Sequence, residues 1–404
     1  MVILGSRPVS VWFGNKITSP DVYLEGSPLD RNVFLFLIVV GLVVLLRRRL
    51  DWGNIFVSNR WLFIFFLYCG ISIVWSDYPF VSLKRWIKDT GNVIMVLLVL
   101  MESEPDKAIR AVFSRLTYLL IPVSVLLIKY FPELGRSYNR WTWEVSYTGV
   151  ATEKNALGSI AFISGLYLIW RVIEMRTEVG QKTDSMDFLG HVVLLLMVLW
   201  LMGIAGSSTA LVCLIIGIGI FLCMRLRIAK SQIRYLGTYS ILIGILILFL
   251  YSLPGVAELF VGILGRDLTL TGRTDIWAEA LKSPFNPFFG AGYQNYWLSY
   301  GRKHFDELGL RGLNQAHNGY LETYLDGGMV GLFFLMAMII NALKNLKKEL
   351  LTDNPTGILC SVFLVVAVVY NLTEAMFNRQ SLVWVIMLFA ALNYNKEFYK
   401  RKSE

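Results

Sequence analysis

A histidine at the edge of an apolar stretch is the first residue whose position suggests chemistry. His317 opens the segment "HNGYLETYLDGGMVGLFF", where Asn318 and Glu322 follow before the sequence becomes strongly apolar. A histidine changes protonation near neutral pH, so it can orient or deprotonate a hydroxyl group. Ionisable residues are costly within a membrane span and usually face a cavity or a partner. A capping role for His317 stays open on these grounds, and Glu322 can orient His317 or hold a sugar hydroxyl.

An arginine precedes a second candidate segment, "TDIWAEALKSP". Thr274 is a suitable N-cap, apolar residues share one face, and Ser283-Pro284 ends the pattern, so a short helix is predicted here. Arg273 then lies at a helix N-terminus, where exposed N–H groups favour an anion and a guanidinium adds a two-pronged phosphate contact. The alternative is an arginine that is solvated at a loop end or paired with Asp267 or Asp275.

Two further polar connections carry basic residues among aromatic ones. Arg85 lies in "SLKRWIKD", and Arg136, Arg140 and Lys154 lie between residues 135 and 155. Such side chains can extend their charged ends to lipid headgroups. Alternatively, they bind a polyanionic lipid ligand, and the tryptophans and tyrosines offer flat faces for its sugar rings. Both interpretations remain open from the residues alone.

The elements that must position these residues are membrane helices. Apolar residues make up 55% of the chain and charged residues 17%, whereas soluble proteins have about 45–50% and about 25%. The apolar residues fall in continuous blocks that suit helices rather than barrel strands. We therefore predict an all-α, polytopic integral membrane protein with about eleven transmembrane helices, at 32–46, 61–75, 92–101, 116–131, 156–170, 188–204, 209–224, 235–251, 328–343, 358–372 and 381–394.

Lysine and arginine residues predict the orientation of these spans. They are densest in alternate short connections and in the C-terminal tail, which the positive-inside rule assigns to the cytoplasm. The predicted organisation is an outside segment at 1–31, spans 1–8 within 32–251, a large outside loop with short helices at 252–317, spans 9–11 within 318–395, and a cytoplasmic tail at 396–404. We expect the outside segment to be either what is left of a helix that is trimmed at the start of the chain or a piece that lies at the membrane interface. All the candidate site residues then face the outside.

Charge and motifs exclude several functional classes. The net charge of +9 belongs mainly to the predicted cytoplasmic segments and suits contact with anionic membrane lipids, so no nucleic-acid partner is expected. The chain contains no HEXXH, CXXC or DXD sequence, no Walker loop and no GxGxxG motif. We therefore predict neither a metal ion nor another cofactor.

Taken together, the motifs resemble those of the O-antigen ligase/polymerase superfamily of bacterial membrane glycosyltransferases. That family carries a histidine followed by Asn, Ser or Gln, then nine residues, then G-x-x-G. Here these positions are His317-Asn318, Gly319–Gly327 and Gly328–Gly331. "GRTDIW" resembles the family's outside arginine motif, while "WSDYPFVSLKRWIKD", "EKNALG" and "GSSTALV" resemble its exopolysaccharide-polymerase branch.

The resemblance implies transfer of a glycan from an undecaprenyl-diphosphate carrier to an acceptor hydroxyl at the outer face of the bacterial cytoplasmic membrane, without a metal. His317 and Arg273 are the expected catalytic residues. The expected substrate-binding residues are Arg85, Arg136, Arg140, Lys154, Asn318 and Glu322. Gly327, Gly328 and Gly331 are expected to allow close helix packing.

The acceptor remains open at this stage. Polymerisation of exopolysaccharide or O-antigen repeat units is favoured over ligation to lipid A core or to a protein, and a polysaccharide chain-length regulator is a conceivable partner. The alternative from another class is a transporter or flippase of the lipid-linked glycan. A transporter predicts inverted repeats and interrupted helices, and the sequence contains no evident repeat.

Overall fold

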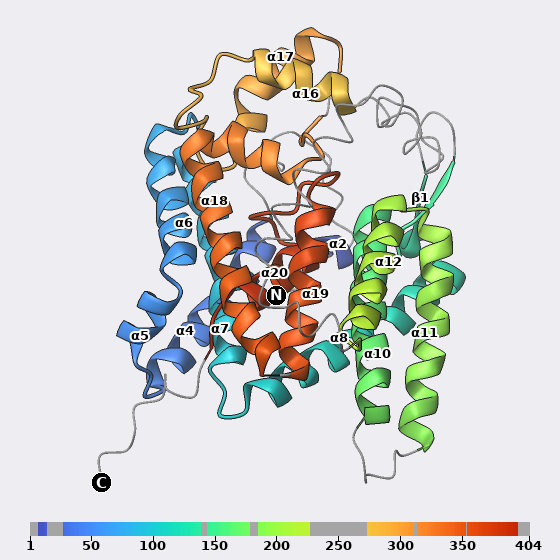
Figure 1. Cartoon of the computed structure of the whole chain (residues 1–404). Helices are drawn as coiled ribbons and strands as arrows, with labels where there is room; N and C mark the ends of the chain where they lie inside the picture. The colour runs from blue at the N-terminus through green and yellow to red at the C-terminus, as the bar shows by residue number, and fades with distance from the viewer. Residues whose placement is uncertain are drawn as a thin grey trace.

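Long helices lie side by side in the computed structural model, between a group of short helices at one end and short connections at the other (Figure 1). The structure describes residues 7–13, 27–138, 144–177, 185–226, 273–310, 313–352 and 354–394, and all structural statements concern these residues. The first half contains α2 (Val9–Trp12), α4 (Pro28–Arg47), α5 (Trp52–Ser58), α6 (Arg60–Ile71), η1 (Ser72–Trp75), α7 (Pro79–Leu100), α8 (Pro105–Tyr130) and α9 (Pro132–Gly135). A short strand pair, β1 (Arg136–Tyr138) and β2 (Val145–Tyr147), follows.

The rest of the chain continues the helical pattern. Its elements are α10 (Lys154–Thr177), α11 (Ser185–Ala205), α12 (Ser208–Cys223), α16 (Arg273–Lys282), η3 (Tyr296–Leu298), α17 (Tyr300–Glu307), α18 (Gly319–Leu351), α19 (Pro355–Tyr370) and α20 (Leu382–Ala391). The α16 helix agrees with the helix predicted after Arg273. The antiparallel β1–β2 pair, in which Ser137 faces Ser146, is the one departure from an all-α structure among the described residues.

A multi-pass helical membrane protein is supported by the lengths and composition of these helices. Five of the described helices, α4, α8, α10, α11 and α18, are long and apolar enough to span a membrane. The α5–α6 pair adds a sixth if its 86° bend lies within one span, and α12, α19 and α20 are shorter apolar helices. The predicted span at 235–251 lies outside the described residues. The count of eleven spans therefore stays a prediction.

The α20 helix lies at the centre of the bundle. All ten of its residues are buried, and it packs against α7, α10, α18 and α19. A helix that is apolar on every side is stable only when other elements surround it. Because α19 and α20 are neighbours, the polar connection between them, residues 371–381, is held at the middle of the bundle end rather than at its edge.

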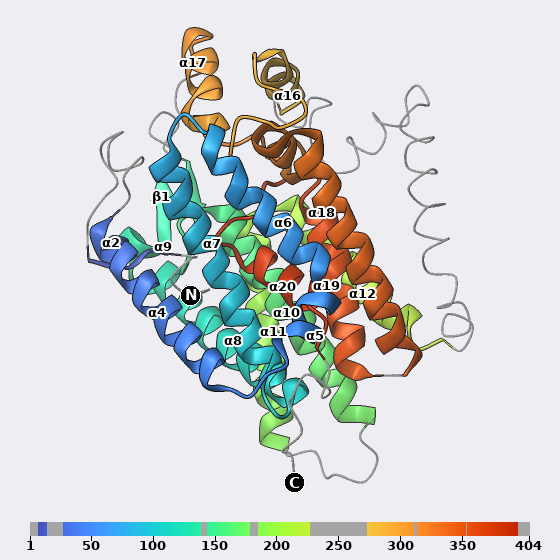
Figure 2. The ribbon, with the colours of Figure 1, turned by 90° about the vertical axis from the view of Figure 1, so that its left-hand side faces the viewer.

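Short elements cover the end of the bundle where the α19–α20 connection lies. We call them the cap, which consists of residues 273–310 and 313–316. Both views place α16 and α17 at the same end of the bundle (Figures 1 and 2). The cap has a small core of its own, to which α18 contributes one residue: Ala280, Ala291, Tyr296, Trp297, Phe305, Ala316 and Leu325. The cap is thus a packed structure seated on the start of α18.

The α18 helix is broken where the cap meets it. Gly328 has φ 63° and ψ −163°, which is not helical. A Cβ atom on Gly328 would lie 2.2 Å from the carbonyl oxygen of Phe288, so only glycine fits this approach. Backbone groups released by the break are satisfied by the cap, through the bonds Ala291 N to Leu325 O, Gly292 N to Asp326 O, Met329 N to Pro287 O and Val330 N to Phe288 O.

This break corrects the expected role of Gly328, whereas Gly327 and Gly331 lie against Tyr68 of α6, as close helix packing predicts. Gly328 was predicted to let two helices pack closely, but it lets a cap segment exchange backbone hydrogen bonds with an interrupted helix. The physical reason is that a positive φ frees N–H and C=O groups, and these must find partners when they are buried.

Candidate functional site

The α19–α20 connection, "NLTEAMFNRQ", organises the candidate site. Asn371 shapes it, because its side-chain oxygen accepts the N–H groups of Met376 and Phe377 at 2.8 and 3.0 Å. Asparagine commonly replaces a backbone acceptor in this way where a chain turns. The N–H of Gly319 donates to the carbonyls of both Asn371 and Glu374, at 2.8 and 3.0 Å. The connection is therefore bonded directly to the first residue of α18.

Glu374 gathers residues from three distant segments, which we call the Glu374 cluster (Arg273, His317, Asn155 and Glu374). Its carboxylate is 2% exposed. Oε1 accepts from Arg273 Nη2 at 2.9 Å and from Asn155 Nδ2 at 2.9 Å. Oε2 lies 3.2 Å from His317 Nδ1. A buried carboxylate needs such a complement of a cation and neutral donors to offset its lost hydration.

His317 takes a backbone conformation that is uncommon for its residue type, with φ 52°. Asn318 is the N-cap of α18, since its Oδ1 accepts from the N–H groups of Tyr320 and Leu321 at 3.0 and 3.1 Å. The capping interpretation of His317 is therefore wrong, and Asn318 has a structural role that was not predicted. A neutral imidazole that donates from Nδ1 to Glu374 has its free lone pair on Nε2, which makes Nε2 the candidate proton acceptor.

Arg273 begins α16, as predicted, but it is not a solvated loop residue. It is 8% exposed, and it donates to the Thr373 carbonyl as well as to Glu374. Thr373 is also bonded through its hydroxyl to Thr209 at 2.8 Å. The four quoted motifs that contain Arg273, His317, Asn155 and Thr209 thus converge on two adjacent residues, neither of which the sequence singled out.

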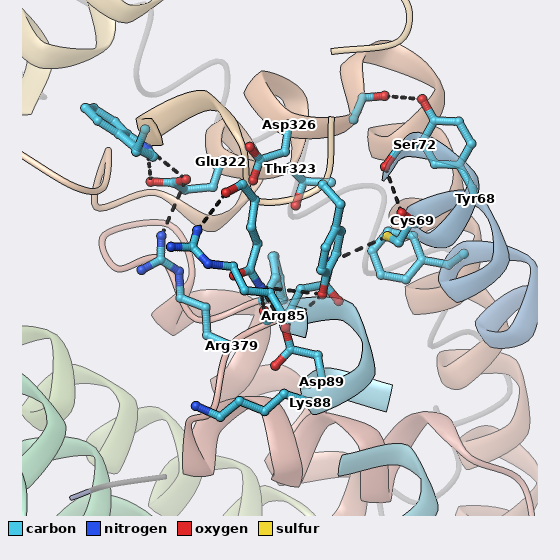
Figure 3. A pocket seen from close by; sticks show the side chains of 18 of the residues that line it. Tyr68, Cys69, Ser72, Arg85, Lys88, Asp89, Glu322, Thr323, Asp326 and Arg379 are labelled. Atoms are coloured by element: carbon cyan, nitrogen blue, oxygen red, sulfur yellow. Dashed lines mark hydrogen bonds and ion pairs between the residues drawn. The ribbon is translucent and has the colours of Figure 1, made fainter. Parts of the chain in front are cut away.

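A cavity of about 270 Å³ lies beside this cluster, beneath the cap and between α6, α7 and α18 (Figure 3). Its charged lining residues are Arg85, Lys88, Asp89, Glu322, Asp326 and Arg379. Arg379 belongs to the same connection as Glu374. The cavity and the Glu374 cluster are therefore built on one short segment.

Glu322 holds the cap rather than His317. Its two oxygens accept from Trp297 Nε1 at 2.9 and 3.0 Å, and one of them also accepts the N–H of Ala316. Arg379 Nη2 lies 3.5 Å from Glu322 Oε2. The prediction that Glu322 orients His317 is thus wrong in this structure, because cap donors occupy its oxygens. It does line the cavity (Figure 3).

Asp326 also fastens the cap. Its Oδ1 accepts the N–H groups of Asn295 and Tyr296, both at 3.1 Å, at the start of η3. Asp326 is not among the site residues that the sequence predicts, but it lines the cavity. Glu322 and Asp326 are one turn apart on α18, which explains why both meet the same short cap segment.

The two charged regions are electrostatically connected through Glu153, which precedes α10. Although its side chain reaches the surface, the surrounding protein partly desolvates the carboxylate and raises its pKa, and the Glu374 carboxylate raises the pKa further. The charges of His317 and Arg379 act in the opposite direction. The pKa of Glu153 therefore depends on charges in the Glu374 cluster and on Arg379 of the cavity.

The remaining predicted residues lie elsewhere. Arg136 donates from Nε and Nη2 to the Ile128 carbonyl, at 3.0 and 2.8 Å, near the end of α8. Its guanidinium also lies 5.7 Å from the Tyr147 ring centre. Lys154 is exposed at the first residue of α10, and Arg140 lies outside the described residues. Neither Arg136 nor Lys154 lines the cavity.

Sequence reasoning missed Glu374, Arg379 and Asp89. One signal was present for Arg379: it is a basic residue in a connection predicted to lie outside, which is the criterion that selected Arg85. Within the described ranges, no three His, Cys, Asp or Glu side chains are grouped so that they could hold a metal ion. Metal independence stays a prediction.

Comparisons with known proteins agree with this architecture. Residues 192–336 match a family model described as O-Antigen ligase, a range that includes Arg273, His317 and the Gly328 break. The chain is also similar to the exopolysaccharide production protein ExoQ of Rhizobium meliloti (strain 1021). The two are 26% identical over 322 residues, which is 77% of this chain and 70% of that protein.

Proposed function

Because this chain belongs to the O-antigen ligase/polymerase superfamily, we propose that it transfers a glycan from undecaprenyl diphosphate to an acceptor hydroxyl at the outer face of the bacterial cytoplasmic membrane. The relative's name associates that protein with exopolysaccharide production. We therefore assign polymerisation of exopolysaccharide-type repeat units to this chain. The outside location follows from the distribution of Lys and Arg, which puts the cap end away from the cytoplasm.

One observation carries this proposal: a single connection presents Glu374 to His317 and Arg379 to the cavity. A segment that holds both Glu374, the partner of the proposed base, and Arg379, a cation of the cavity, suits a reaction in which a hydroxyl attacks and a diphosphate leaves. Arg273 was expected to neutralise the diphosphate. Since its guanidinium is buried against Glu374 and Thr373, we assign it to positioning Glu374, and we assign the diphosphate to Arg85 and Arg379.

In the proposed reaction, the acceptor oxygen forms a bond to the anomeric carbon as the bond from that carbon to the diphosphate oxygen breaks. The acceptor proton passes to His317 Nε2, and undecaprenyl diphosphate leaves with both electrons of the broken bond. Glu374 stabilises the imidazolium that forms, as a buried carboxylate does when it orients a catalytic histidine. Arg85 and Arg379 stabilise the charge of the leaving group, which is most effective in a site shielded from water.

Reconstitution tests the proposal. The purified protein in liposomes receives a lipid-linked repeat unit, with a chelator and no nucleotide sugar. We expect longer glycans and release of undecaprenyl diphosphate. Transfer only after addition of lipid A core would favour the ligase instead.

A transporter is the competing class, and the interrupted α18 is a feature that transporters share. Here the break is filled by cap backbone rather than left open to a pathway. Movement of the lipid-linked glycan across the bilayer without any glycan transfer would overturn the enzyme proposal. A chain-length regulator stays a prediction from the resemblance.

A further inference from the structure

A third carboxylate lies at the cavity wall, and the proposed reaction does not use it. Asp89 on α7 is 3% exposed. Its Oδ2 accepts from the Tyr293 hydroxyl at 2.9 Å and from Gln294 Nε2 at 2.7 Å, and its Oδ1 accepts from Gln380 Nε2 at 2.9 Å. These donors belong to the cap and to the α19–α20 connection. Asp89 therefore joins three separate elements at one point.

Gln294 connects Asp89 to Arg85. The two residues lie one turn apart on α7, on the same face of the helix. Gln294 reaches both: its side-chain amide donates to Asp89, and its backbone carbonyl oxygen accepts from Arg85 Nη1 at 2.7 Å. To do so, Gln294 adopts φ 46°, a conformation that non-glycine residues rarely take unless their surroundings enforce it.

The same network reaches Arg379. The Gln294 amide also donates to the carbonyl of Asn378, at 2.5 Å, and Asn378 has φ 52°. Gln380 donates to Asp89 and to the Lys88 carbonyl, at 2.9 and 3.0 Å. The residues on both sides of Arg379 are thus bonded into the Asp89 network.

We propose that Asp89 is the positioning residue of the cavity, which sets the placement of Arg85 and Arg379 for the diphosphate through Gln294, Asn378 and Gln380. This inference rests on the proposed function. Preorganised cations stabilise a leaving group most when they need not move during the reaction. Asp89 accepts from three neutral side-chain donors, and these bonds fix the positions of the segments that carry the donors.

A double-mutant cycle tests the inference. Asp89→Asn keeps the shape but turns one acceptor oxygen into a donor that faces other donors. We expect kcat/KM for the lipid-linked donor to fall by about 10-fold to 100-fold, the range found when a group that orients a functional ligand is removed. In a background that carries both Arg85→Ala and Arg379→Ala, the same substitution should change kcat/KM by less than about threefold, because both positioned groups are already absent.

Binding supplies a readout that does not depend on turnover. Undecaprenyl diphosphate in nanodiscs should bind Asp89→Asn about tenfold more weakly than the wild type. In the background that lacks both Arg85 and Arg379, it should bind equally with and without Asp89→Asn. If Asp89→Asn does not insert into the membrane, or if it melts at a lower temperature than the wild type, Gln294→Ala replaces it in the same measurements. Glu279→Gln is the matched control. Its carboxylate pairs with Lys282 and His304 on the cap surface, and the substitution should leave kcat/KM unchanged.

The outcomes separate the two proposals. A wild-type protein that does not elongate the glycan would overturn the proposed function itself. The positioning role would be overturned by an active wild type in which Asp89→Asn lowers kcat/KM and binding as much without Arg85 and Arg379 as it does with them. That result would make Asp89 a purely structural link.

Discussion

In the Glu374 cluster the cation Arg273 is buried against a carboxylate, whereas in the cavity the cation Arg379 is partly exposed beside one. Arg273 is 8% exposed and bonded to a carboxylate that is 2% exposed. The Arg379 side chain is 35% exposed and lies 3.5 Å from Glu322. A buried ion pair holds geometry, while an accessible cation can exchange its partner for a ligand. Arg273, which has a strong motif, is therefore part of the frame of the site, whereas the less conspicuous Arg379 is accessible to a ligand.

The largest effect on stability and on glycan elongation should come from breaking the buried Arg273–Glu374 ion pair. Glu374→Ala leaves Arg273 buried without its carboxylate, which typically costs about 3–5 kcal/mol of folding free energy. We expect a lower melting temperature together with loss of glycan elongation. Glu279→Ala, which removes an exposed carboxylate of the cap, is the control and should leave both measurements unchanged. Normal melting of Glu374→Ala would show that the cluster does not hold the fold.

Removing the histidine should separate activity from stability. His317 is 26% exposed, so His317→Ala should insert and melt normally. Elongation should fall by about 10²-fold to 10⁴-fold, the usual contribution of a positioned acid or base. The rate of glycan elongation in liposomes checks this. Wild-type rates in His317→Ala would remove the histidine from the mechanism.

The cavity cations should affect substrate handling with little change in stability. Arg379→Ala removes a partly exposed charge whose ion pair contributes about 0–1 kcal/mol at most. Elongation should still fall by about 10²-fold, since one preorganised donor to a developing charge has roughly that effect. Arg379→Lys should recover part of the activity. If Arg379→Ala instead lost stability as Glu374→Ala does, the contrast between the two regions would disappear.

Glu153 provides a smaller, pH-dependent comparison. Its pKa is raised in the folded protein, so the folded state binds more protons than the unfolded state between the two pKa values. The associated stability is present below the unfolded pKa and is lost as pH rises through the folded pKa. The melting temperature of wild type relative to Glu153→Gln should therefore decline as pH rises through that window. A rise over the same pH range would reverse the sign assigned to Glu153.

Arg136 should have the smallest effect. Arg136→Ala removes two bonds to the Ile128 carbonyl, and about 1 kcal/mol of stability is the usual scale of such a contact. Elongation should be unchanged, because Arg136 does not line the cavity. A marked loss of elongation would return Arg136 to the substrate site where the sequence placed it.

Local patterns were enough to predict much of the helical structure. Each described apolar block lies largely within helical elements, and the Ser283-Pro284 pair correctly marked the end of α16. The helix begins at Arg273, one residue before the predicted N-cap Thr274. Those features depend on residues close in sequence, such as continuous apolarity, caps and breakers. The same reasoning selected Arg273 and His317, which the structure brings together on Glu374.

The sequence by itself determined which segments are apolar helices and which residues carry reactive groups. Only the tertiary structure decided what those groups contact. Arg273 and Glu374 are 101 residues apart, and Asp89 and Gln294 are 205 apart. No periodicity encodes such pairings. They arise because α20 is buried inside the bundle, so that the α19–α20 connection lies at the centre of the bundle end, in contact with the cap and α18. A buried carboxylate there must find donors from whichever elements surround it.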